Sequence, residues 1–317
     1  MLNKIIAISD CDHLNMKEER QICDRYGLEF VLFQCKSEDD LIQSLPGYSA
    51  VVNQYAPFTE RVFAALPDLK MIVRYGVGVN NIDLEAASRH HVAVCNVPDY
   101  GVQEVATHAF ALMMALTRKI VRMDASVKSG EWEYAHSIPI RRYSEMTFGI
   151  VGLGRIGTCF AEMLHPFGGR ILGCEINRRR KLPDFVEQVD FETLVRESDV
   201  ISLHCNLETS RNLFHMDVMR SMKPEAVLVN VSRGGIVNES DLAAALNSGI
   251  IAGAGIDVTA QEPLPGNSPL LSARNIVLTP HMAWYSEESS SSLKAKTAEE
   301  AARFLTGKPL LNQLNPF

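Results

Sequence analysis

The sequence predicts an α/β protein with two doubly wound parallel sheets, and three observations lead to that fold class. Short apolar runs alternate with stretches long enough for helices, which is the order expected of strands joined by crossover helices. About eleven such runs occur, too many for one comfortable sheet. The chain has 317 residues, which suits two medium domains.

The predicted strands fall into two sets separated by a helical stretch. The first set comprises residues 4–8, 29–33, 50–52, 69–73 and 92–95, and the second comprises residues 148–152, 170–174, 199–205, 226–231, 252–257 and 275–279. Their unbroken apolar character is typical of parallel strands that helices cover on both faces. We therefore expect one parallel sheet in each of two α/β domains.

Two further helices are predicted from residue patterning. Residues 102–121 carry apolar side chains almost all the way round a helix, so we expect a connecting or dimer helix buried between domains or subunits. Residues 287–307 are rich in Glu and Ala and are followed by Pro309, which is typical of a helix that stops at Gly307.

The amino-acid composition is typical of a globular protein and argues against several classes of partner. Hydrophobic residues make up 46% and charged residues 22%, an ordinary globular balance, and the net charge of -7 argues against nucleic acid or acidic membranes as partners. The longest helix-like uncharged run, residues 105–117, is too short to span a bilayer, and the apolar run near the N-terminus is too short for a secretory signal. We expect a cytoplasmic protein with small-molecule partners.

The cysteines give no sign of a metal or disulfide framework. There are seven of them, an odd number, with no CxxC pair. We expect reduced, buried thiols and no metal site.

A glycine pattern predicts a dinucleotide-binding turn. Gly152, Gly154 and Gly157 form GxGxxG between a predicted strand and a predicted helix. Gly152 permits a tight turn, Gly154 lets backbone N–H groups approach a pyrophosphate, and Gly157 lets helix and strand pack closely. Glu175 ends the next strand, where a carboxylate can accept hydrogen bonds from ribose hydroxyls.

The residues after Glu175 bear on the choice of dinucleotide. Residues 177–181, NRRRK, could neutralise a 2′-phosphate or form a solvated surface turn. The Glu175 carboxylate repels that phosphate, so we predict NAD and keep NADP as the alternative.

Three polar residues follow the later strands, where ligands bind in open α/β sheets. They are Arg233, Glu262 and His281. Hydride addition to a 2-oxo acid creates an alkoxide beside a carboxylate, so the reaction needs a proton donor and a permanent positive charge. His281 can supply the proton, Arg233 can contact carboxylate and carbonyl oxygens, and Glu262 can orient His281 and favour its imidazolium.

Together these motifs resemble the D-isomer-specific 2-hydroxyacid dehydrogenase family across nearly the whole chain. The matching stretches are VRYGVGVNNID (73–83), CNVPD (95–99), GIVGLGRIG (149–157), NVSRGGIVNE (230–239), GIDVTAQEP (255–263) and TPHMAW (279–284). The resemblance implies that Arg233, Glu262 and His281 are catalytic. It also implies an NAD(P)-dependent oxidoreductase that interconverts a small 2-oxo acid and a D-2-hydroxy acid.

The resemblance further implies an arrangement of domains and site. Residues 1–98 and 284–317 would form a flavodoxin-like substrate domain, and residues 99–283 an inserted Rossmann domain that binds NAD. Other cofactor-binding candidates are Arg155, Ile156, Cys205, Asn206, Val231, Ser232 and Asp257. The substrate carboxylate is expected on the loop of Arg74, Tyr75, Gly76, Val77 and Gly78, because glycine lets backbone N–H groups converge on an anion.

The ending TPHMAWYSEE looks like the C-terminal-binding-protein branch, in which a Trp three residues after the catalytic His lines the substrate pocket. Here that residue is Trp284. The same branch suggests a second hypothesis, a dinucleotide-sensing, corepressor-like interaction module, although the chain keeps all three catalytic residues. A third hypothesis is an NADP-linked hydroxypyruvate or glyoxylate reductase. We expect a homodimer.

Overall fold

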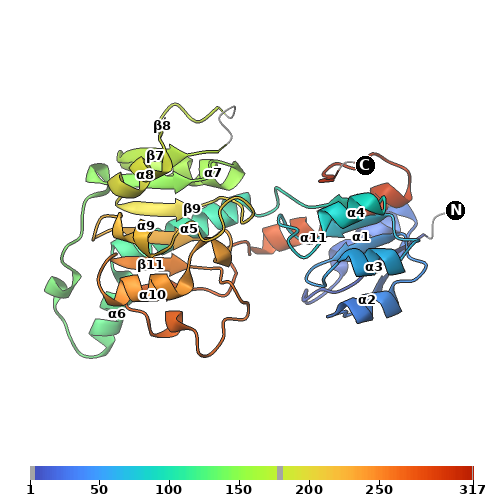
Figure 1. Cartoon of the computed structure of the whole chain (residues 1–317), viewed down its shortest axis with the longest axis horizontal. Coiled ribbons are helices and arrows are strands. Elements are labelled where there is room, and N and C mark those ends of the chain that lie inside the picture. The colour runs from blue at the N-terminus through green and yellow to red at the C-terminus, as the bar shows by residue number, and fades with distance from the viewer. Residues whose placement is uncertain (1–3, 177–180, 316) are drawn as a thin grey trace. The chain divides into compact units, whose positions relative to one another are not determined.

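The computed structural model describes residues 4–176, 181–315 and 317. The chain divides into two compact units, Met1–Gly101 with Ser286–Phe317, and Val102–Tyr285. The domain boundaries expected from the sequence fall at 98/99 and 283/284. In each unit a parallel sheet lies between helices (Figure 1).

The first unit contains a five-stranded sheet in the order β2-β1-β3-β4-β5, with every pair parallel. This is the flavodoxin-like order that the sequence analysis expects. Its strands are β1 (Ile5–Ile8), β2 (Glu29–Leu32), β3 (Ala50–Asn53), β4 (Met71–Arg74) and β5 (Ala93–Cys95). Its helices are α1 (Lys17–Tyr26), α2 (Glu38–Ser44), α3 (Glu60–Ala65), α4 (Leu84–Arg89) and α11 (Glu287–Leu305).

The second unit contains a seven-stranded parallel sheet in the order β12-β11-β10-β9-β6-β7-β8. The strands are β6 (Thr147–Val151), β7 (Arg170–Cys174), β8 (Val186–Gln188), β9 (Val200–Leu203), β10 (Val227–Asn230), β11 (Gly253–Ile256) and β12 (Ile276–Leu278). The helices are α5 (Val102–Thr117), α6 (Ile120–Lys128), α7 (Arg155–Leu164), α8 (Phe191–Glu197), α9 (Met216–Arg220) and α10 (Glu239–Asn247). The order outward from β6 on both sides is that of a Rossmann sheet.

The local sequence explains where several helices begin. Ser37 and Asp40 form a capping box at the start of α2, and the side chain of Asp83 caps α4. Ser286 caps α11, the helix that returns the chain to the first unit. Apolar residues of the strands then pack against the inward faces of these helices, so each unit has a buried apolar core of its own.

Two details of the sequence-based fold are wrong. The short strand β8 was not predicted, because two of its three side chains are exposed and it lacks a buried apolar run. The single helix expected over 102–121 is two helices, α5 and α6, which are separated at Lys119, where φ is 54°. The apolar residues of α5 are explained by its own unit, since the helix packs on β10, β11 and α7.

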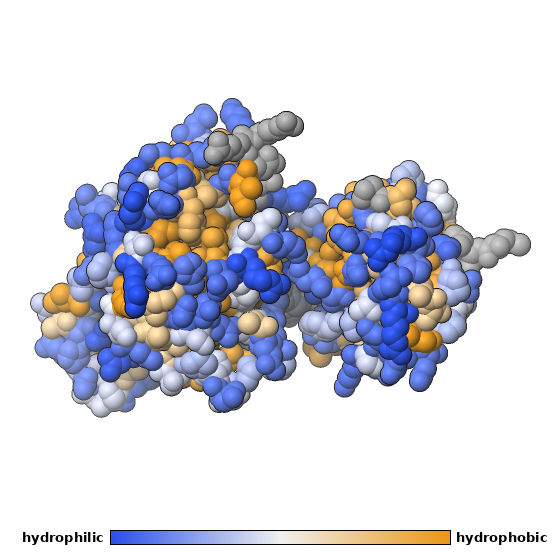
Figure 2. Space-filling view, viewed as in Figure 1, coloured by the Kyte–Doolittle hydropathy of each residue, from blue (hydrophilic) through white to orange (hydrophobic). Residues whose placement is uncertain are grey.

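The surface and the cysteines complete the description. Hydrophilic residues cover most of the visible face of both units, with apolar areas between them on the second unit (Figure 2). All seven cysteines are free; four are buried and three are partly buried. No helix in the described part of the chain is long and apolar enough to cross a membrane.

Candidate active site

The glycine-rich turn joins β6 to α7, and its backbone leaves no room for side chains. Gly152 has a φ of 89°, and a Cβ there would lie 2.7 Å from the carbonyl oxygen of His204. A Cβ on Gly157 would lie 2.0 Å from the carbonyl oxygen of Gly152. Gly154 is the N-cap of α7, so the first N–H groups of this helix lack intrahelical acceptors. Such a cradle suits the pyrophosphate of a dinucleotide.

Glu175 directly follows β7, and its carboxylate reaches the glycine-rich turn. Its Oε2 accepts a hydrogen bond from the backbone N–H of Leu153 at 2.8 Å. A carboxylate beside the turn fits the adenosine ribose of the same dinucleotide. Within the basic run, residues 177–180 lie outside the described residues, and Lys181 is exposed.

The other predicted cofactor residues follow strands β6, β9 and β10, which are neighbours in the sheet. Arg155 and Ile156 open α7, Cys205 and Asn206 follow β9, and Val231 and Ser232 follow β10. The Asn206 side chain caps a turn by accepting from Thr209, and Ser232 Oγ donates to the carbonyl oxygen of Leu203 at 2.6 Å. All six residues therefore lie at the C-terminal edge of the sheet.

His204 is a residue at this turn that the sequence analysis missed. Its Nε2 lies 2.8 Å from Ser202 Oγ, while its buried Nδ1 has no partner among the described residues. Burial lowers the pKa of His204 to about 3, so the ring is neutral at physiological pH. The ring packs against Phe160 of α7, with centroids 5.2 Å apart. Its signal in the sequence is a His within an apolar strand run.

Arg233 follows β10 on a loop that a buried asparagine holds. Asn230 Nδ2 donates to the carbonyl oxygen of Arg233 at 2.9 Å, and its Oδ1 accepts from the N–H of Ser232 at 3.1 Å. Arg233 Nη1 also donates to the carbonyl oxygen of Ser232 at 2.7 Å. Asn230 was not predicted as a site residue, although an Asn at the end of an apolar strand was the available signal.

The Arg233 loop touches the loop that carries Glu262. A Cβ on Gly234 would lie 1.9 Å from the carbonyl carbon of Thr259, so only glycine allows this approach. The N–H of Thr259 in turn donates to Glu262 Oε1 at 3.0 Å. The backbone of one loop therefore sets the position of the other.

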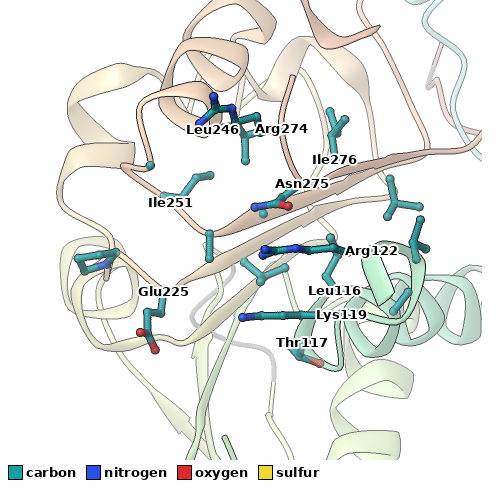
Figure 3. Close-up of a pocket in the computed structure, with 18 of the residues that line it drawn as sticks. Leu116, Thr117, Lys119, Arg122, Glu225, Leu246, Ile251, Arg274, Asn275 and Ile276 are labelled. Atoms are coloured by element: carbon teal, nitrogen blue, oxygen red, sulfur yellow. The ribbon is translucent and has the colours of Figure 1, made fainter. Parts of the chain in front are cut away.

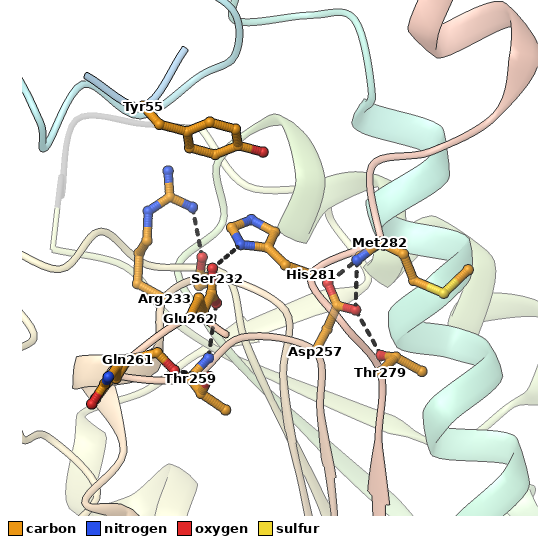
Figure 4. A network of polar contacts seen from close by, with 12 residues as sticks. Tyr55, Ser232, Arg233, Asp257, Thr259, Gln261, Glu262, Thr279, His281 and Met282 are labelled. Carbon is orange, nitrogen blue, oxygen red and sulfur yellow. Dashed lines mark hydrogen bonds and ion pairs between the residues drawn. The ribbon is translucent and has the colours of Figure 1, made fainter. Parts of the chain in front are cut away.

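His281 and Glu262 form a direct pair. His281 Nδ1 lies 2.6 Å from Glu262 Oε2, and both side chains are about two-fifths exposed. Burial raises the pKa of Glu262, but hydrogen bonds from His281 and Thr259 and the positive charge of Arg233 bring it below its usual value. Figure 4 shows Arg233, Glu262 and His281 together at the ends of their strands. Because Nδ1 is engaged, Nε2 of His281 is the nitrogen that can face a substrate.

Asp257 holds the segment that carries His281. Its side chain has no exposed surface, its Oδ1 accepts from Thr279 Oγ1 at 2.6 Å and from the N–H of Met282 at 3.0 Å, and its Oδ2 accepts from the N–H of Ala283 at 3.0 Å (Figure 4). His108 Nε2 lies 3.0 Å from Thr279 Oγ1 on the same network. Asp257 therefore positions the His281 loop, and its contact with a cofactor stays a prediction.

In the first unit, residues 74–78 begin at the last residue of β4, and two of their carbonyl groups accept hydrogen bonds from neighbouring residues. The carbonyl of Gly76 accepts from the N–H of Val97 at 2.9 Å, and that of Val77 accepts from Asn96 Nδ2 at 2.6 Å. Among the described residues, none accepts a hydrogen bond from the N–H groups of Gly76, Val77 or Gly78. Gly76 has a φ of 136°, which favours glycine. Unpaired amides of this kind suit an anion.

Arg74 adds positive charge to the same loop. A Cβ on Gly76 would lie 2.0 Å from Arg74 Nη1, so the guanidinium lies against the backbone there. Arg74 Nε also donates to the carbonyl oxygen of Gln54 at 3.2 Å. The loop 54–56 is held by buried Asp10, which accepts from the N–H groups of Gln54, Tyr55 and Ala56. Asp10 was missed in the sequence, where a single Asp after a strand gave no motif.

Trp284 lies at the end of the second unit. It is partly buried and meets Tyr285 edge-on, with ring centroids 5.5 Å apart. Its place in a substrate pocket stays a prediction.

A cavity of about 650 Å³ lies in the second unit, where strands of its sheet begin (Figure 3). Its walls include Val227, Gly253 and Ile276, the first residues of β10, β11 and β12, whereas Arg233, Glu262 and His281 follow the last residues of these strands. Lys119 and Arg122 also line it. The cavity is therefore separate from the candidate active site.

Comparison with known proteins agrees with this geometry. A family model described as the NAD binding domain of D-isomer specific 2-hydroxyacid dehydrogenases matches residues 110–283. A glyoxylate reductase from Korarchaeum cryptofilum is 40% identical over 268 residues, which cover 82% of this chain and 80% of that protein. A D-3-phosphoglycerate dehydrogenase from Synechocystis is 38% identical over 283 residues, which cover 88% of this chain but only 51% of that protein.

A solved structure extends the likeness to nearly the whole fold. An acyclic imino acid reductase in complex with NADPH and D-Arg superposes with a TM-score of 0.88 at 27% identity, covering 98% of this chain and 99% of that one. These matches support the family as a whole and do not single out the C-terminal-binding-protein branch. The chain belongs to the D-isomer-specific 2-hydroxyacid dehydrogenases, NAD-binding oxidoreductases that act on CH–OH groups.

Proposed function

We propose that the chain is an NADH-dependent reductase that converts a small 2-oxo acid to the D-2-hydroxy acid. The observation that carries the proposal is the 2.6 Å contact between His281 and Glu262 beside the Arg233 loop. The contact supports the proposal because a proton donor, a carboxylate that supports it and a permanent cation would then share one sheet edge. The relative named glyoxylate reductase favours a 2-oxo acid with a short side chain.

Each of the three side chains has a separate task in the reaction. A dinucleotide held at the glycine-rich turn would supply the hydride that the carbonyl carbon receives. Arg233 binds the substrate carboxylate and carbonyl oxygen through its planar guanidinium. The imidazolium of His281 donates the Nε2 proton to the oxygen that becomes the hydroxyl, and the neutral ring then takes a proton from water. Glu262 holds the ring by Nδ1 and stabilises its charged form.

The chain's own residues fit NAD at the glycine-rich turn. Gly152 and Gly157 let the turn pack closely against His204 and the start of α7, whose first N–H groups then suit a pyrophosphate. The Glu175 carboxylate suits ribose hydroxyls but repels a 2′-phosphate. We therefore propose NADH over NADPH. The alternative rests on residues 177–180, and the imino acid reductase with a similar fold binds NADPH.

We propose that the first unit supplies the substrate-binding surface. The amides of Gly76, Val77 and Gly78 and the charge of Arg74 would receive the substrate carboxylate. Trp284 would face the side chain of the substrate and so select among 2-oxo acids.

The test is a panel of 2-oxo acids assayed with NADH and with NADPH. We expect steady NADH oxidation with glyoxylate or hydroxypyruvate and a lower kcat/KM with NADPH. Binding of NADH without turnover of any acid would instead indicate a dinucleotide-sensing module. A higher kcat/KM with NADPH would overturn the role of Glu175 and leave the reductase assignment in place.

We further propose a homodimer formed through the segment 120–138. α6 has no buried residue, and Trp132 and Tyr134 are 89% and 78% exposed. Exposed apolar side chains grouped in one segment are typical of an interface. Charge favours a second copy as the occupant, because Glu131 and Glu133 of this segment could pair with Arg122 of the same segment and with Lys119 beside it in the other copy.

Light scattering after gel filtration tests the homodimer. We expect a dimer for the wild type and a monomer for Trp132→Glu. Leu14→Glu is the control, because Leu14 is fully exposed in the first unit and lies outside the proposed interface. A monomeric wild type, or a Trp132→Glu variant that stays dimeric, would refute this surface.

A further inference from the structure

A buried cluster of ionisable residues lies directly behind the 74–78 loop. Tyr75 is 2% exposed, and its hydroxyl donates to Glu19 Oε1 of α1 at 2.9 Å. Glu19 is 1% exposed, and its other oxygen, Oε2, lies 3.8 Å from Lys294 Nζ of α11. The hydroxyl of a loop residue is thus connected through one carboxylate to an ammonium group on the C-terminal helix.

Lys294 is itself held on more than one side. Its Nζ donates to Glu18 Oε2 at 2.5 Å and to Asn15 Oδ1 at 3.0 Å, and the residue is only 4% exposed. The ring of His13 meets the Tyr75 ring edge-on, with centroids 4.8 Å apart. The position of Tyr75 is therefore determined from α1, from α11 and from the segment between β1 and α1.

A buried cluster of this kind adds little to the stability of the fold, but it can fix the position of the Tyr75 side chain. Buried charges lose hydration, so apolar packing of the same volume often stabilises a protein as well or better. A hydrogen bond to a buried carboxylate, in contrast, defines where a hydroxyl lies. Burial raises the pKa of Glu19, which shows the cost of keeping this carboxyl group in the interior.

The cluster holds Tyr75, which directly precedes the three residues whose amides could bind an anion. The backbone N–H of Tyr75 donates to the carbonyl oxygen of Asn53 at 2.8 Å, and the next three residues are those whose amides have no described acceptor. Holding both the backbone and the hydroxyl of Tyr75 fixes the direction in which the chain enters this segment.

We propose that Glu19 and Lys294 are positioning residues for the amides of Gly76, Val77 and Gly78, acting through the Tyr75 hydroxyl. The inference rests on the proposed role of these amides in receiving a substrate carboxylate. Glu19 and Lys294 would tune the affinity for the 2-oxo acid and leave the chemical step at His281 alone.

The experiment compares Tyr75→Phe and Lys294→Met with a matched control, Tyr26→Phe. Tyr26 also donates its hydroxyl to a glutamate, Glu299 of α11, but it has no contact with the loop among the described residues. All three substitutions nearly preserve side-chain volume. Hydrogen exchange of the peptide that spans residues 76–82 is measured without substrate, and the KM for glyoxylate and the Kd for NADH are measured on the same samples.

We expect faster exchange of this peptide and a KM that rises about threefold to tenfold in both variants, because buried Glu19 loses the hydrogen bond from Tyr75 in Tyr75→Phe and its ion pair in Lys294→Met. kcat and the Kd for NADH should stay within about twofold, and Tyr26→Phe should match the wild type. Unchanged exchange in both cluster variants would overturn the positioning role. So would a KM increase that Tyr26→Phe shares equally, since that would be a general effect of loosening α1 from α11.

The exchange measurement separates this inference from the proposed function. If the wild type turned over no 2-oxo acid, the proposed function would fail, and faster exchange in the cluster variants alone would still support the positioning role. If the wild type is active and exchange rises without any change in KM, these residues do not tune substrate binding and the inference is wrong.

Discussion

The two sheets carry functional loops at the same kind of edge but hold them in different ways. In the second unit most of the supports are closer in sequence: Asn230 holds the carbonyl of Arg233 three residues away and Asp257 holds Ala283 at a separation of 26, although His108 contacts Thr279 across 171 residues. In the first unit Glu19 reaches Tyr75 across 56 residues, and Lys294 reaches Glu18 across 276. The loops of Arg233 and His281 thus rest mainly on supports that are close in sequence, whereas the 74–78 loop rests on contacts between segments far apart in the sequence.

This difference teaches where substitutions should act. In the second unit the side chains that we propose to be catalytic are themselves partly exposed, as the pair of His281 and Glu262 shows. In the first unit the polar side chains that hold the loops are buried, and we propose that backbone amides receive the substrate carboxylate. Changes in the second unit should therefore lower kcat or the affinity for NADH, whereas changes in the first unit should raise KM for the acid.

The largest effect is expected for His281→Ala. Without the proton donor, kcat should fall by about 10² to 10⁴. The Kd for NADH, measured by fluorescence titration, should stay near that of the wild type because the glycine-rich turn is intact. A kcat close to the wild-type value would remove His281 from the mechanism.

Arg233→Lys should come next, with kcat/KM reduced by about 10 to 100 fold. The charge is retained, but an ammonium cannot make the two parallel hydrogen bonds of a guanidinium. Steady-state kinetics with glyoxylate would measure the loss. If the lysine variant kept near-normal kcat/KM, Arg233 would have only a structural role in its loop and would not bind substrate.

Glu262→Gln tests the support of the proton donor through pH. The pKa of Glu262 is below its usual value, so in the wild type the carboxylate persists as the pH falls from neutrality and is lost only when the pH drops through that lowered pKa. Removing its charge destabilises the imidazolium of His281. The basic limb of the pH profile of kcat/KM should therefore move to lower pH, with about tenfold lower activity near pH 8. A basic limb that stays in place would argue against the pair.

Glu175→Ala tests the proposed dinucleotide site, which lies at the same C-terminal edge of the second sheet. The Kd for NADH should rise by about tenfold, since an acceptor for the ribose is lost, and the Kd for NADPH should fall because the repulsive charge is gone. Paired fluorescence titrations measure both values. Equal weakening of both dinucleotides would show that Glu175 only holds the turn through the N–H of Leu153.

The smallest effect is expected in the first unit, from Asp10→Asn. The amide retains one oxygen, but it loses the negative charge and the second oxygen with which Asp10 accepts hydrogen bonds from the N–H groups of the loop 54–56. KM for the 2-oxo acid should rise about threefold with kcat nearly unchanged. A fall in kcat with constant KM would contradict the claim that the first unit affects substrate binding and the second unit affects the chemical step.

The same difference explains what could be predicted from the sequence. The glycine-rich turn was visible because the glycines themselves create the space, and Arg233, Glu262 and His281 were visible because each follows a strand within a short motif. Asn230 and His204 were harder, since a single polar residue in an apolar strand does not reveal its partner. The contacts of Glu19 and Lys294 were out of reach, because they depend on α11 packing against α1.

The boundaries of regular structure were also limited by tertiary packing. The end of α5 was missed because the apolar pattern continues past Thr117, while the chain turns at Lys119 with a φ of 54°. The residues of α5 that suggested an interface are covered by β10 and β11 instead. Periodicity reports that a side chain is apolar, and only the fold decides what covers it.

The most direct test of the central claim is a single turnover. In separate reactions, enzyme with one equivalent of NADH is mixed with excess glyoxylate, hydroxypyruvate or pyruvate. NADH absorbance is followed in each reaction, and the products are then separated on a chiral column. The account predicts that each mole of NADH oxidised yields one mole of 2-hydroxy acid, that the chiral acids are the D-isomers, and that His281→Ala binds NADH without oxidising it at a comparable rate. NADH that stays reduced with every acid, or an L-product, would contradict it.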